Sequence, residues 1–424
     1  MRFKNIDDFV IHCLVEGVKI HKKITAHTFE LCITHDRKFF KKIFYNIFSY
    51  LNKRKDKRAF KYLYSKYSEC TANLNKPISL PFVRIRYGIS VCLYSIDNDK
   101  GYIIYQTRII INPSLFMKSF DPIFNPESYD YTLIIPRDSE FWIKFGPKLK
   151  KFLSNWDILN ESKTFLIHLA RIDMCADISV PDDFPISTYI GYIHRVIKSF
   201  TYDDEDFPID QYMHQSTTYN KSQAFTIYEK MYEQKVHHHN YYDDGSQLLR
   251  LEYKLYSRKI RHILSKVSED SEMEIYQQVT TRRSLDDILY TVENLVMLSP
   301  IIILYGINLI FPKGAFLPQK DIKRLVKDCV KRKQTRYDIY EIIFKLSLYK
   351  DYTDVVAVSK RIRESFSPIK YNRLLRKMEE IGVAPLYLDK EDSDIGSLPS
   401  LHDLFLSALF QTEGESEYMQ MLLL

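Results

Sequence analysis

Apolar side chains recur at helical spacing near the start of the chain. Between residues 37 and 53 they stand three and four positions apart with lysines between them, as on a helix with one buried face. We therefore expect residues 1–75 to form a basic, mainly helical segment. Five of the six residues at 53–58 are Lys or Arg. That run is either a solvated helix face or an arm that lies on DNA phosphates.

Strand-like alternation replaces the helical spacing in residues 76–260. β-Branched and aromatic residues are frequent at 83–87 and 102–111, as in strands, and buried strands with embedded acids are expected at 171–180 and 247–256. A helix is expected between them at 139–156. This mixture predicts an α+β domain built on an antiparallel sheet and flanked by helical regions.

Helical spacing returns in residues 261–388, as at 323–330, 337–348 and 371–380. Residues 353–383 fit a helix-turn-helix or winged helix in which Ser367 and Pro368 start the second helix. Helical hairpins of this kind also occur in proteins that bind no DNA, so the pattern leaves DNA binding open. An acidic tail, residues 389–424, follows and has a short helix expected at 401–409.

Charge is distributed unevenly along the chain. The 424 residues carry a net charge of +7. The acidic tail has one lysine against eight acidic residues and so carries −7, which leaves +14 on the preceding residues. A body this basic suits the phosphate backbone of a nucleic acid.

Six cysteines are scattered without zinc-like spacing, which indicates reduced thiols. The opening residues show no secretion signal, and we expect a cytoplasmic location. The uncharged run at 294–312 is long enough to cross a membrane, but Pro300 and Gly306 interrupt it. A buried core segment is the better interpretation, and no membrane is expected as a partner.

Three acidic residues stand on the predicted buried strands. Asp173 and Asp177 share one side of an extended strand, since residues four apart lie on the same face. Glu252 interrupts an apolar run. Buried carboxylates need a compensating cation. Either a divalent ion, Mg or Mn given the hard oxygen ligands, or ion pairs with Arg171 and Arg250 would satisfy them.

Tyr228 lies between these strands, with Lys230 two positions on. A tyrosine can attack a phosphodiester and hold one DNA end covalently. Its phenol, with an ordinary pKa of about 10, needs help from a cation such as Lys230. In a chain with 32 tyrosines, packing is the alternative role.

The order of these patches resembles the single-tyrosine replication initiators of rolling-circle plasmids, a family with related initiators in filamentous phages. The matching motifs are Arg-Ile-Asp at 171–173 with Asp177, Ile-Tyr-Glu-Lys at 227–230 with Glu233, and Arg-Leu-Glu at 250–252. The segment 108–113 is similar to a further strand that ends Asn-Pro. The resemblance covers about residues 78–261. Ile110 stands where the family often has an acid, and residues 218–222 depart from the family's glycine-containing stretch.

The resemblance implies an HUH-endonuclease-like nicking domain and a metal-dependent strand transferase that acts on an origin. The product is a 5′-phosphotyrosine link and a 3′-hydroxyl that primes replication. Partners implied are double-stranded and single-stranded or hairpin origin DNA, a host helicase and polymerase, and a second copy in a homodimer. The residues implied are Tyr228 and Lys230 for catalysis, Asp173, Asp177 and Glu252 for Mg or Mn, and Arg171, Arg250, Lys254 and Lys221 for DNA. A non-catalytic DNA-binding replication regulator and a mobilisation relaxase are the alternatives.

Other residues with suggestive chemistry have simpler explanations. Tyr232 stands one helical turn after Tyr228 and is either a second nucleophile or a packing residue. The three histidines at 237–239 cannot all converge on one ion from a strand, so a polar loop is expected. His168 is expected to be a core residue or a support for the site.

Overall fold

The computed structural model describes residues 24–53, 79–80, 82–97, 103–124, 134–159, 164–196, 214–237, 247–270, 284–349, 360–362 and 364–410. In this part of the chain the architecture is α+β, as predicted, and centres on an eight-stranded antiparallel sheet of order β2-β3-β4-β1-β5-β8-β7-β6. The strands are β1 (Ile24–His35), β2 (Val83–Arg86), β3 (Ile89–Asp97), β4 (Ile103–Ile111), β5 (Thr164–Val180), β6 (Gln215–Tyr219), β7 (Gln223–Glu229) and β8 (Gln247–Tyr256).

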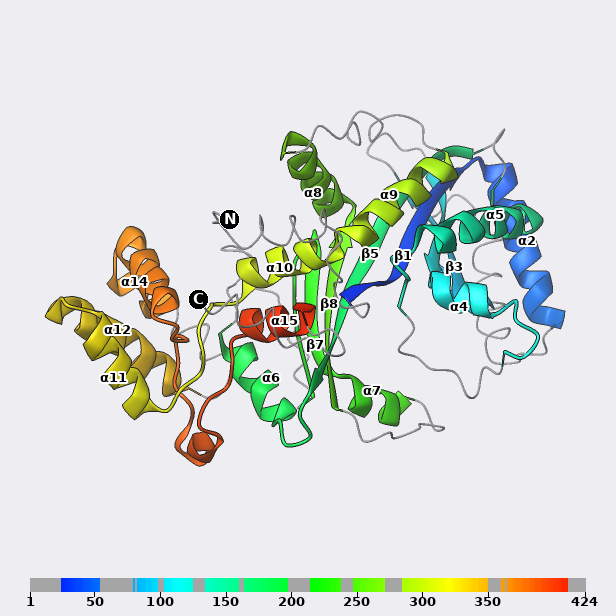
Figure 1. Ribbon diagram of the computed structural model, residues 1–424. Coiled ribbons are helices and arrows are strands. Elements are labelled where there is room, and N and C mark those ends of the chain that lie inside the picture. Colours follow the sequence, from blue (N-terminus) through cyan, green and yellow to red (C-terminus); the bar gives the residue numbers. More distant parts are fainter. Residues whose placement is uncertain are drawn as a thin grey trace.

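Strand β1 corrects the expectation of a mainly helical N-terminal segment. It lies in the middle of the sheet, between β4 and β5 (Figure 1). Its sequence alternates in the way a strand requires: Phe29, Leu31 and Ile33 are fully buried on one face, while Thr28 and Glu30 point to the other. The helix expected next is present as α2 (Arg37–Lys53). The basic run after residue 53 lies outside the described residues.

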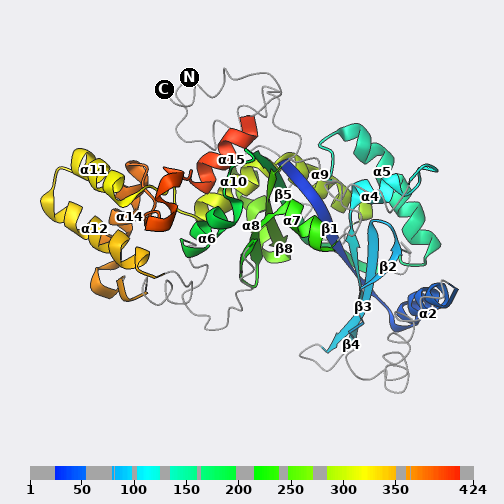
Figure 2. The same ribbon diagram turned by 90° about the horizontal axis from the view of Figure 1, so that it is seen from below.

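Helices pack on the apolar face of the sheet (Figures 1 and 2). Helices α9, α10 and α15 contact β5, and Phe145 of α5 meets Phe29 of β1 at a ring-centroid distance of 6.3 Å. The helix predicted at 139–156 is present as α5. The helix bounds are α4 (Pro113–Lys118), α5 (Ser139–Asn155), α6 (Ile186–Arg195), α7 (Lys230–His237), α8 (Ser257–Asp270), α9 (Leu285–Met297), α10 (Ser299–Ile310) and α15 (Leu401–Phe410).

The uncharged run at 294–312 is divided between α9 and α10, which are bent by 64° relative to each other. Ile303, Leu304 and Ile307 are at most 1% exposed in the main core. Among the described residues no single helix is long and apolar enough to cross a membrane, and this bent pair reaches the length only in combination.

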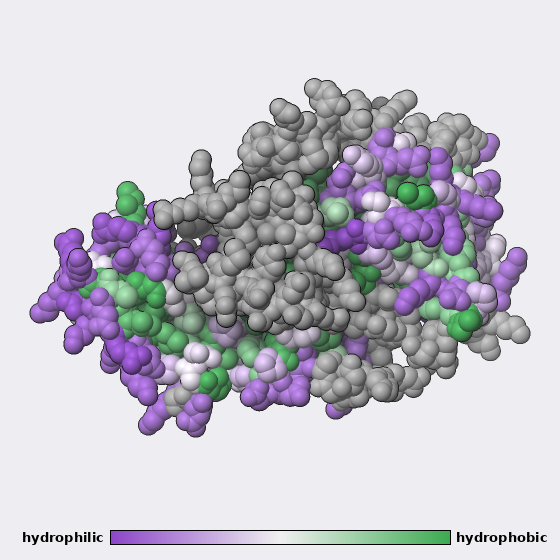
Figure 3. Space-filling view, viewed as in Figure 1, coloured by the Kyte–Doolittle hydropathy of each residue, from purple (hydrophilic) through white to green (hydrophobic). Residues whose placement is uncertain are grey.

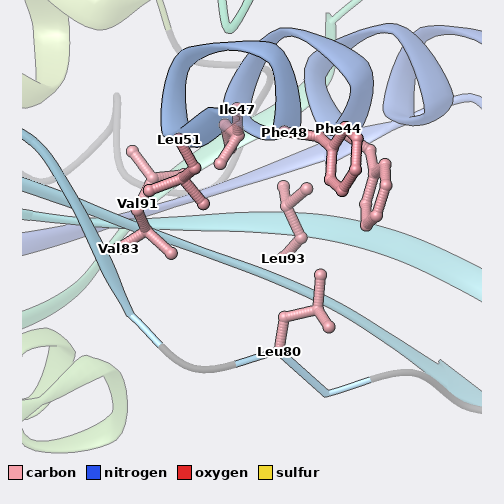
Figure 4. A pocket seen from close by; sticks show the side chains of 8 residues that line it. All are labelled: Phe44, Ile47, Phe48, Leu51, Leu80, Val83, Val91 and Leu93. Atoms are coloured by element: carbon pink, nitrogen blue, oxygen red, sulfur yellow. The ribbon is translucent and has the colours of Figure 1, made fainter. Parts of the chain in front are cut away.

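At the outer end of the sheet, α2 packs over β2 and β3 and leaves a small apolar pocket (Figure 4). The lining residues are Phe44, Ile47, Phe48, Leu51, Leu80, Val83, Val91 and Leu93.

A second, smaller core lies in the helices that follow the sheet. Helices α11 (Gln319–Cys329), α12 (Lys333–Ser347) and α14 (Pro368–Glu380) confirm the helical pattern expected there. They bury their own cluster, which includes Ile342, Leu374 and Met378. Residues 350–359, where the first helix of the predicted helix-turn-helix would begin, lie outside the described residues.

The start of the acidic tail is built into the fold. Asp389 pairs with Arg195 of α6 at 3.1 Å, and the short helix η3 (Lys390–Ile395) follows it. The helix expected at 401–409 is present as α15, where Leu401 and Phe405 are fully buried in the main core. These residues therefore form part of the main domain's packing.

Gly306 offers a test of the packing between α10 and the sheet. A Cβ atom at this position would lie 2.7 Å from Cε1 of Tyr253, a fully buried residue of β8. We expect Gly306→Ala to lower the free energy of unfolding by about 1–3 kcal/mol, because the added methyl overfills a close contact. Urea unfolding monitored by circular dichroism measures the change.

Gly191 of α6 is the matched control, since a Cβ there meets nothing within 4 Å. Replacing a helical glycine by alanine in open space is expected to stabilise by about 0.5–1 kcal/mol. Equal effects of the two substitutions would contradict the packing of α10 described above.

Candidate active site

Strand pairing places most of the predicted site residues on one polar face of the sheet. Asp173 of β5 is opposite Lys254 of β8, and Asp177 is opposite Arg250. Arg250 is in turn opposite Tyr228 of β7. Because directly opposed residues share a face, these side chains from three neighbouring strands project to the same side. The sequence prediction that they lie near one another agrees with this register.

Arg250 and Asp177 form a buried ion pair. Both side chains are 2% exposed, and the guanidinium donates to both carboxylate oxygens, with Nη2 2.6 Å from Oδ2. Burial alone would lower the pKa of Arg250, but the charge and hydrogen bonds of Asp177 raise it well above its usual range. Both oxygens of Asp177 are therefore committed to the arginine.

Glu252 receives hydrogen bonds from two partners on different strands. The hydroxyl of Tyr228 lies 2.6 Å from Oε1, and Nε2 of His27 on β1 lies 3.0 Å from the same oxygen. The ammonium of Lys254 is 3.6 Å from Oε2. A tyrosine hydroxyl is thus held against a carboxylate that is itself oriented by a histidine, which is the arrangement of a nucleophile, a base and a group that positions the base.

Hydrogen bonds continue from His27 to Asp173. Thr28 donates its hydroxyl to Oδ2 of Asp173 at 2.7 Å, and Nδ1 of His27 is 3.1 Å from the same hydroxyl. Since that hydroxyl has a single hydrogen, Nδ1 acts as the donor to it. Nε2 lies 3.0 Å from the Glu252 carboxylate, so His27 bridges Thr28 and Glu252.

The two ends of the Tyr228–Glu252 contact have opposite pKa shifts. Burial, then the charge of Glu252, raises the pKa of Tyr228, and Arg250 only partly offsets this. Burial would also raise the pKa of Glu252, but His27, Lys254 and Arg250 together lower it well below its usual range. The resting pair is therefore a neutral phenol and a carboxylate.

A further buried acid, Glu30 of β1, extends the charged face beyond the residues that the sequence motifs indicated. It is fully buried and pairs with Arg108, and Arg171 lies 3.6 Å from its second oxygen. Arg171 also lies 3.0 Å from Asp173. Glu30 is directly opposite Ile110 on β4. A carboxylate therefore stands beside Ile110 on the neighbouring strand.

His27, Thr28 and Glu30 were missed because their segment was interpreted as helical. The signal that could have found them is the two-residue alternation after position 28, in which polar side chains alternate with Phe29, Leu31 and Ile33.

The remaining predicted residues lie at or beyond the edge of the hydrogen-bonded cluster around Tyr228 and Glu252. Lys230 is buried, pairs with Glu233 at 2.7 Å, and lies 5.7 Å from the centroid of the Tyr228 ring. Tyr232 is 42% exposed and stacks on His214 with a centroid distance of 3.6 Å. Lys221 is exposed in the turn between β6 and β7, at the opposite end of β7 from Tyr228.

The two sets of histidines have different outcomes. Of the three histidines expected in a polar loop, His237 is the last residue of α7, and residues 238–246 lie outside the described residues. His168 is partly buried on β5, opposite Cys32 of β1.

The three predicted metal ligands do not converge. In the part of the chain that the structure describes, no group of three or more His, Cys, Asp or Glu side chains could hold a metal ion. Asp177 is bound by Arg250, Asp173 by Thr28 and Arg171, and Glu252 by its own donors. For Asp173 and Asp177 the arrangement matches the predicted ion pairs with Arg171 and Arg250. Glu252 has other partners, and the three side chains as they lie do not fit a metal.

Comparison with known proteins gives no further assignment. No family model matches the chain, and no match was found among curated proteins or solved structures.

The depressed pKa of Glu252 predicts a specific dependence of stability on pH. Its contribution is fully present above the ordinary glutamate value of 4.5 and is lost as the pH falls toward the lower value in the folded protein. We expect Glu252→Gln to be less stable than wild type at pH 7, and the difference to shrink as the pH falls below about 4.5. Chemical unfolding at a series of pH values measures this difference.

Glu140 is the control, because its side chain is 69% exposed in an i,i+4 pair on α5. Glu140→Gln is expected to stay within about 0.5 kcal/mol of wild type throughout. A difference between wild type and Glu252→Gln that is constant with pH would show that Glu252 is not held as a stabilised carboxylate.

Proposed function

We propose that this chain is a site-specific DNA-nicking enzyme that starts rolling-circle replication. The observation that carries the proposal is the hydrogen bond from Tyr228 to Glu252, beside the cationic groups of Arg250 and Lys254 and the imidazole of His27. The order of the motifs along the chain agrees with it. The enzyme binds an origin as a homodimer, and host helicase and polymerase continue from the nick.

The chemistry follows from the positions of these groups. Glu252 takes the proton of Tyr228 while the phenol oxygen forms a bond to phosphorus. The bond from phosphorus to the 3′ oxygen breaks, and that oxygen takes a proton from water to give a 3′-hydroxyl. The phosphate stays on Tyr228 as a 5′-phosphotyrosine. Because the pKa of Tyr228 is raised, the proton leaves during the attack and not before it, which is general base catalysis.

The cationic side chains provide the complementary half of the site. Arg250 is opposite Tyr228, and Lys254 is two residues beyond Glu252 on the same face. Positive groups in such a buried setting stabilise the negative charge that develops on the phosphate oxygens. His27 keeps Glu252 in place through its own hydrogen bond.

Metal dependence is a separate part of the proposal. The resemblance implies Mg or Mn, but Asp173, Asp177 and Glu252 are each bonded to other partners. We therefore assign no step of the reaction to a metal ion held by these three residues. Chelation of divalent ions in the nicking assay below measures the requirement directly.

A non-catalytic DNA-binding regulator is the second candidate. It is favoured by the same ion pairs, since the carboxylates on this face are already neutralised by groups of the chain and Tyr228 is held as a neutral phenol. Such a protein keeps the charged face as a structural network. The two candidates differ in whether a covalent bond to DNA forms.

The deciding experiment incubates the purified full chain with a supercoiled plasmid that carries the DNA flanking its gene, in Mg, in Mn or with a chelator. We expect nicked circles and a denaturation-resistant, protease-sensitive protein adduct. Tyr228→Phe is expected to abolish both products, because it removes the attacking oxygen. Glu252→Gln is expected to slow nicking by about 100-fold or more, as for loss of a general base.

Tyr232→Phe is the matched control, since Tyr232 follows Tyr228 by four residues but lies on α7 and stacks on His214, outside the hydrogen-bonded group. It is expected to keep the adduct. An adduct that persists in Tyr228→Phe would show that another residue is the nucleophile. Binding without any nick or adduct in wild type would favour the regulator.

A further inference from the structure

Helix α14 presents a row of exposed side chains to solvent. Ile369, Asn372, Arg373 and Arg376 are all exposed, Ile369 by 82%. They stand at positions i, i+3, i+4 and i+7, so they lie on one face of the helix. The opposite face, formed by residues 371, 374 and 378, is buried in the second core. The row is thus directed away from the protein, and we call it the α14 face.

The two arginines of the α14 face are not engaged by the described part of the chain. Two neighbouring lysines, in contrast, form ion pairs. Lys370 pairs with Asp338 at 2.8 Å, and Lys377 pairs with Glu380 at 2.9 Å. Neither Arg373 nor Arg376 forms an ion pair with a described residue. Two guanidinium groups are therefore directed to solvent between two lysines that are already neutralised.

The region around the α14 face is strongly basic. Residues 319–380 contain seventeen Lys and Arg against nine Asp and Glu, a net charge of +8 that exceeds the +7 of the whole chain. Hydrophilic residues predominate over the end of the molecule that α11, α12 and α14 form (Figure 3). A polyanion is the partner that matches this charge.

The start of α14 has the local structure of a groove-reading helix. Residues 360–362 and 364–365 are helical and a short turn at 366–367 leads into α14. Ser367 caps the helix by accepting a hydrogen bond from the backbone of Lys370 at 3.3 Å, and Pro368 occupies its first turn. In a helix-turn-helix the second helix enters the major groove and its N-terminal residues contact base edges.

We propose that the α14 face reads the major groove of double-stranded DNA. Arginine donates a bidentate pair of hydrogen bonds to guanine, asparagine pairs with adenine, and an exposed aliphatic group such as Ile369 contacts the methyl of thymine. The α14 face thus has the side chains for sequence recognition, whereas scattered lysines bind phosphate without discrimination. This binding is separate from the chemistry of Tyr228 and does not depend on it.

The test is selection from a library of random double-stranded DNA by the purified full chain at physiological salt. Wild type is expected to enrich a defined sequence. Arg373→Ala, Arg376→Ala and Asn372→Ala are each expected to weaken binding to that sequence by about 10- to 100-fold and to relax selection at particular base positions. Because all three residues are exposed, the three variants are expected to unfold at the same temperature as wild type.

Arg324→Ala on α11 is the control, because that side chain is 71% exposed but lies off the α14 face and is paired with Asp321 at 3.3 Å. It is expected to weaken binding less than the α14 variants do, to weaken it equally for all sequences, and to leave the selected sequence unchanged. Tyr228→Phe is expected to select the same sequence as wild type, which separates recognition from nicking.

Two outcomes overturn the inference. The first is that wild type enriches no sequence from the library. The second is that the α14 variants select the same sequence as wild type and bind it with unchanged affinity. The second outcome would move recognition elsewhere even if the nicking activity is found. If the protein bound an acidic peptide and no duplex DNA, that result would also overturn the inference.

Discussion

Strand β1 is the connection on which the rest of the sheet depends. It pairs with β4 on one side and with β5 on the other, so it joins the half formed by β2, β3 and β4 to the half formed by β5, β8, β7 and β6. The same strand carries His27, Thr28 and Glu30 to the charged face. Continuity of the sheet and orientation of the candidate base Glu252 therefore come from one segment.

The two faces of the sheet are stabilised by different interactions. Apolar side chains such as Phe29 and Tyr253 pack against helices on one face. The other face carries an alternating row of acids and cations in which each charge has a partner. A buried charge that loses its partner costs about 3–5 kcal/mol. Stability and any chemistry at Glu252 are therefore coupled, because each substitution that tests the chemistry also removes part of this network.

Sequence patterns predicted an antiparallel-sheet domain, several of the helices and the shared face of Asp173 and Asp177, whereas the strand register adds Glu252 and Tyr228 to that face. Those predictions used local periodicity and the order of motifs, which depend on residues close together in the chain. Strand β1 was missed because it directly precedes an amphipathic helix whose period dominates the region. The contact of His27 with Glu252 joins residues 225 positions apart, and no local pattern encodes such a pairing.

The central position of β1 has a consequence for how the chain folds during synthesis. Thr28 meets Asp173, which is 145 positions away in the chain, and Ser299 of α10 meets the backbone of Ile24, which is 275 positions away. Non-local pairings of this kind make folding slow, because the entropy of closing a long loop is lost before the contact forms. While the chain emerges, both edges of β1 lack partners and are open to wrong pairing. We therefore expect lower temperature or added chaperones during expression to raise the fraction of chains that reach the native sheet.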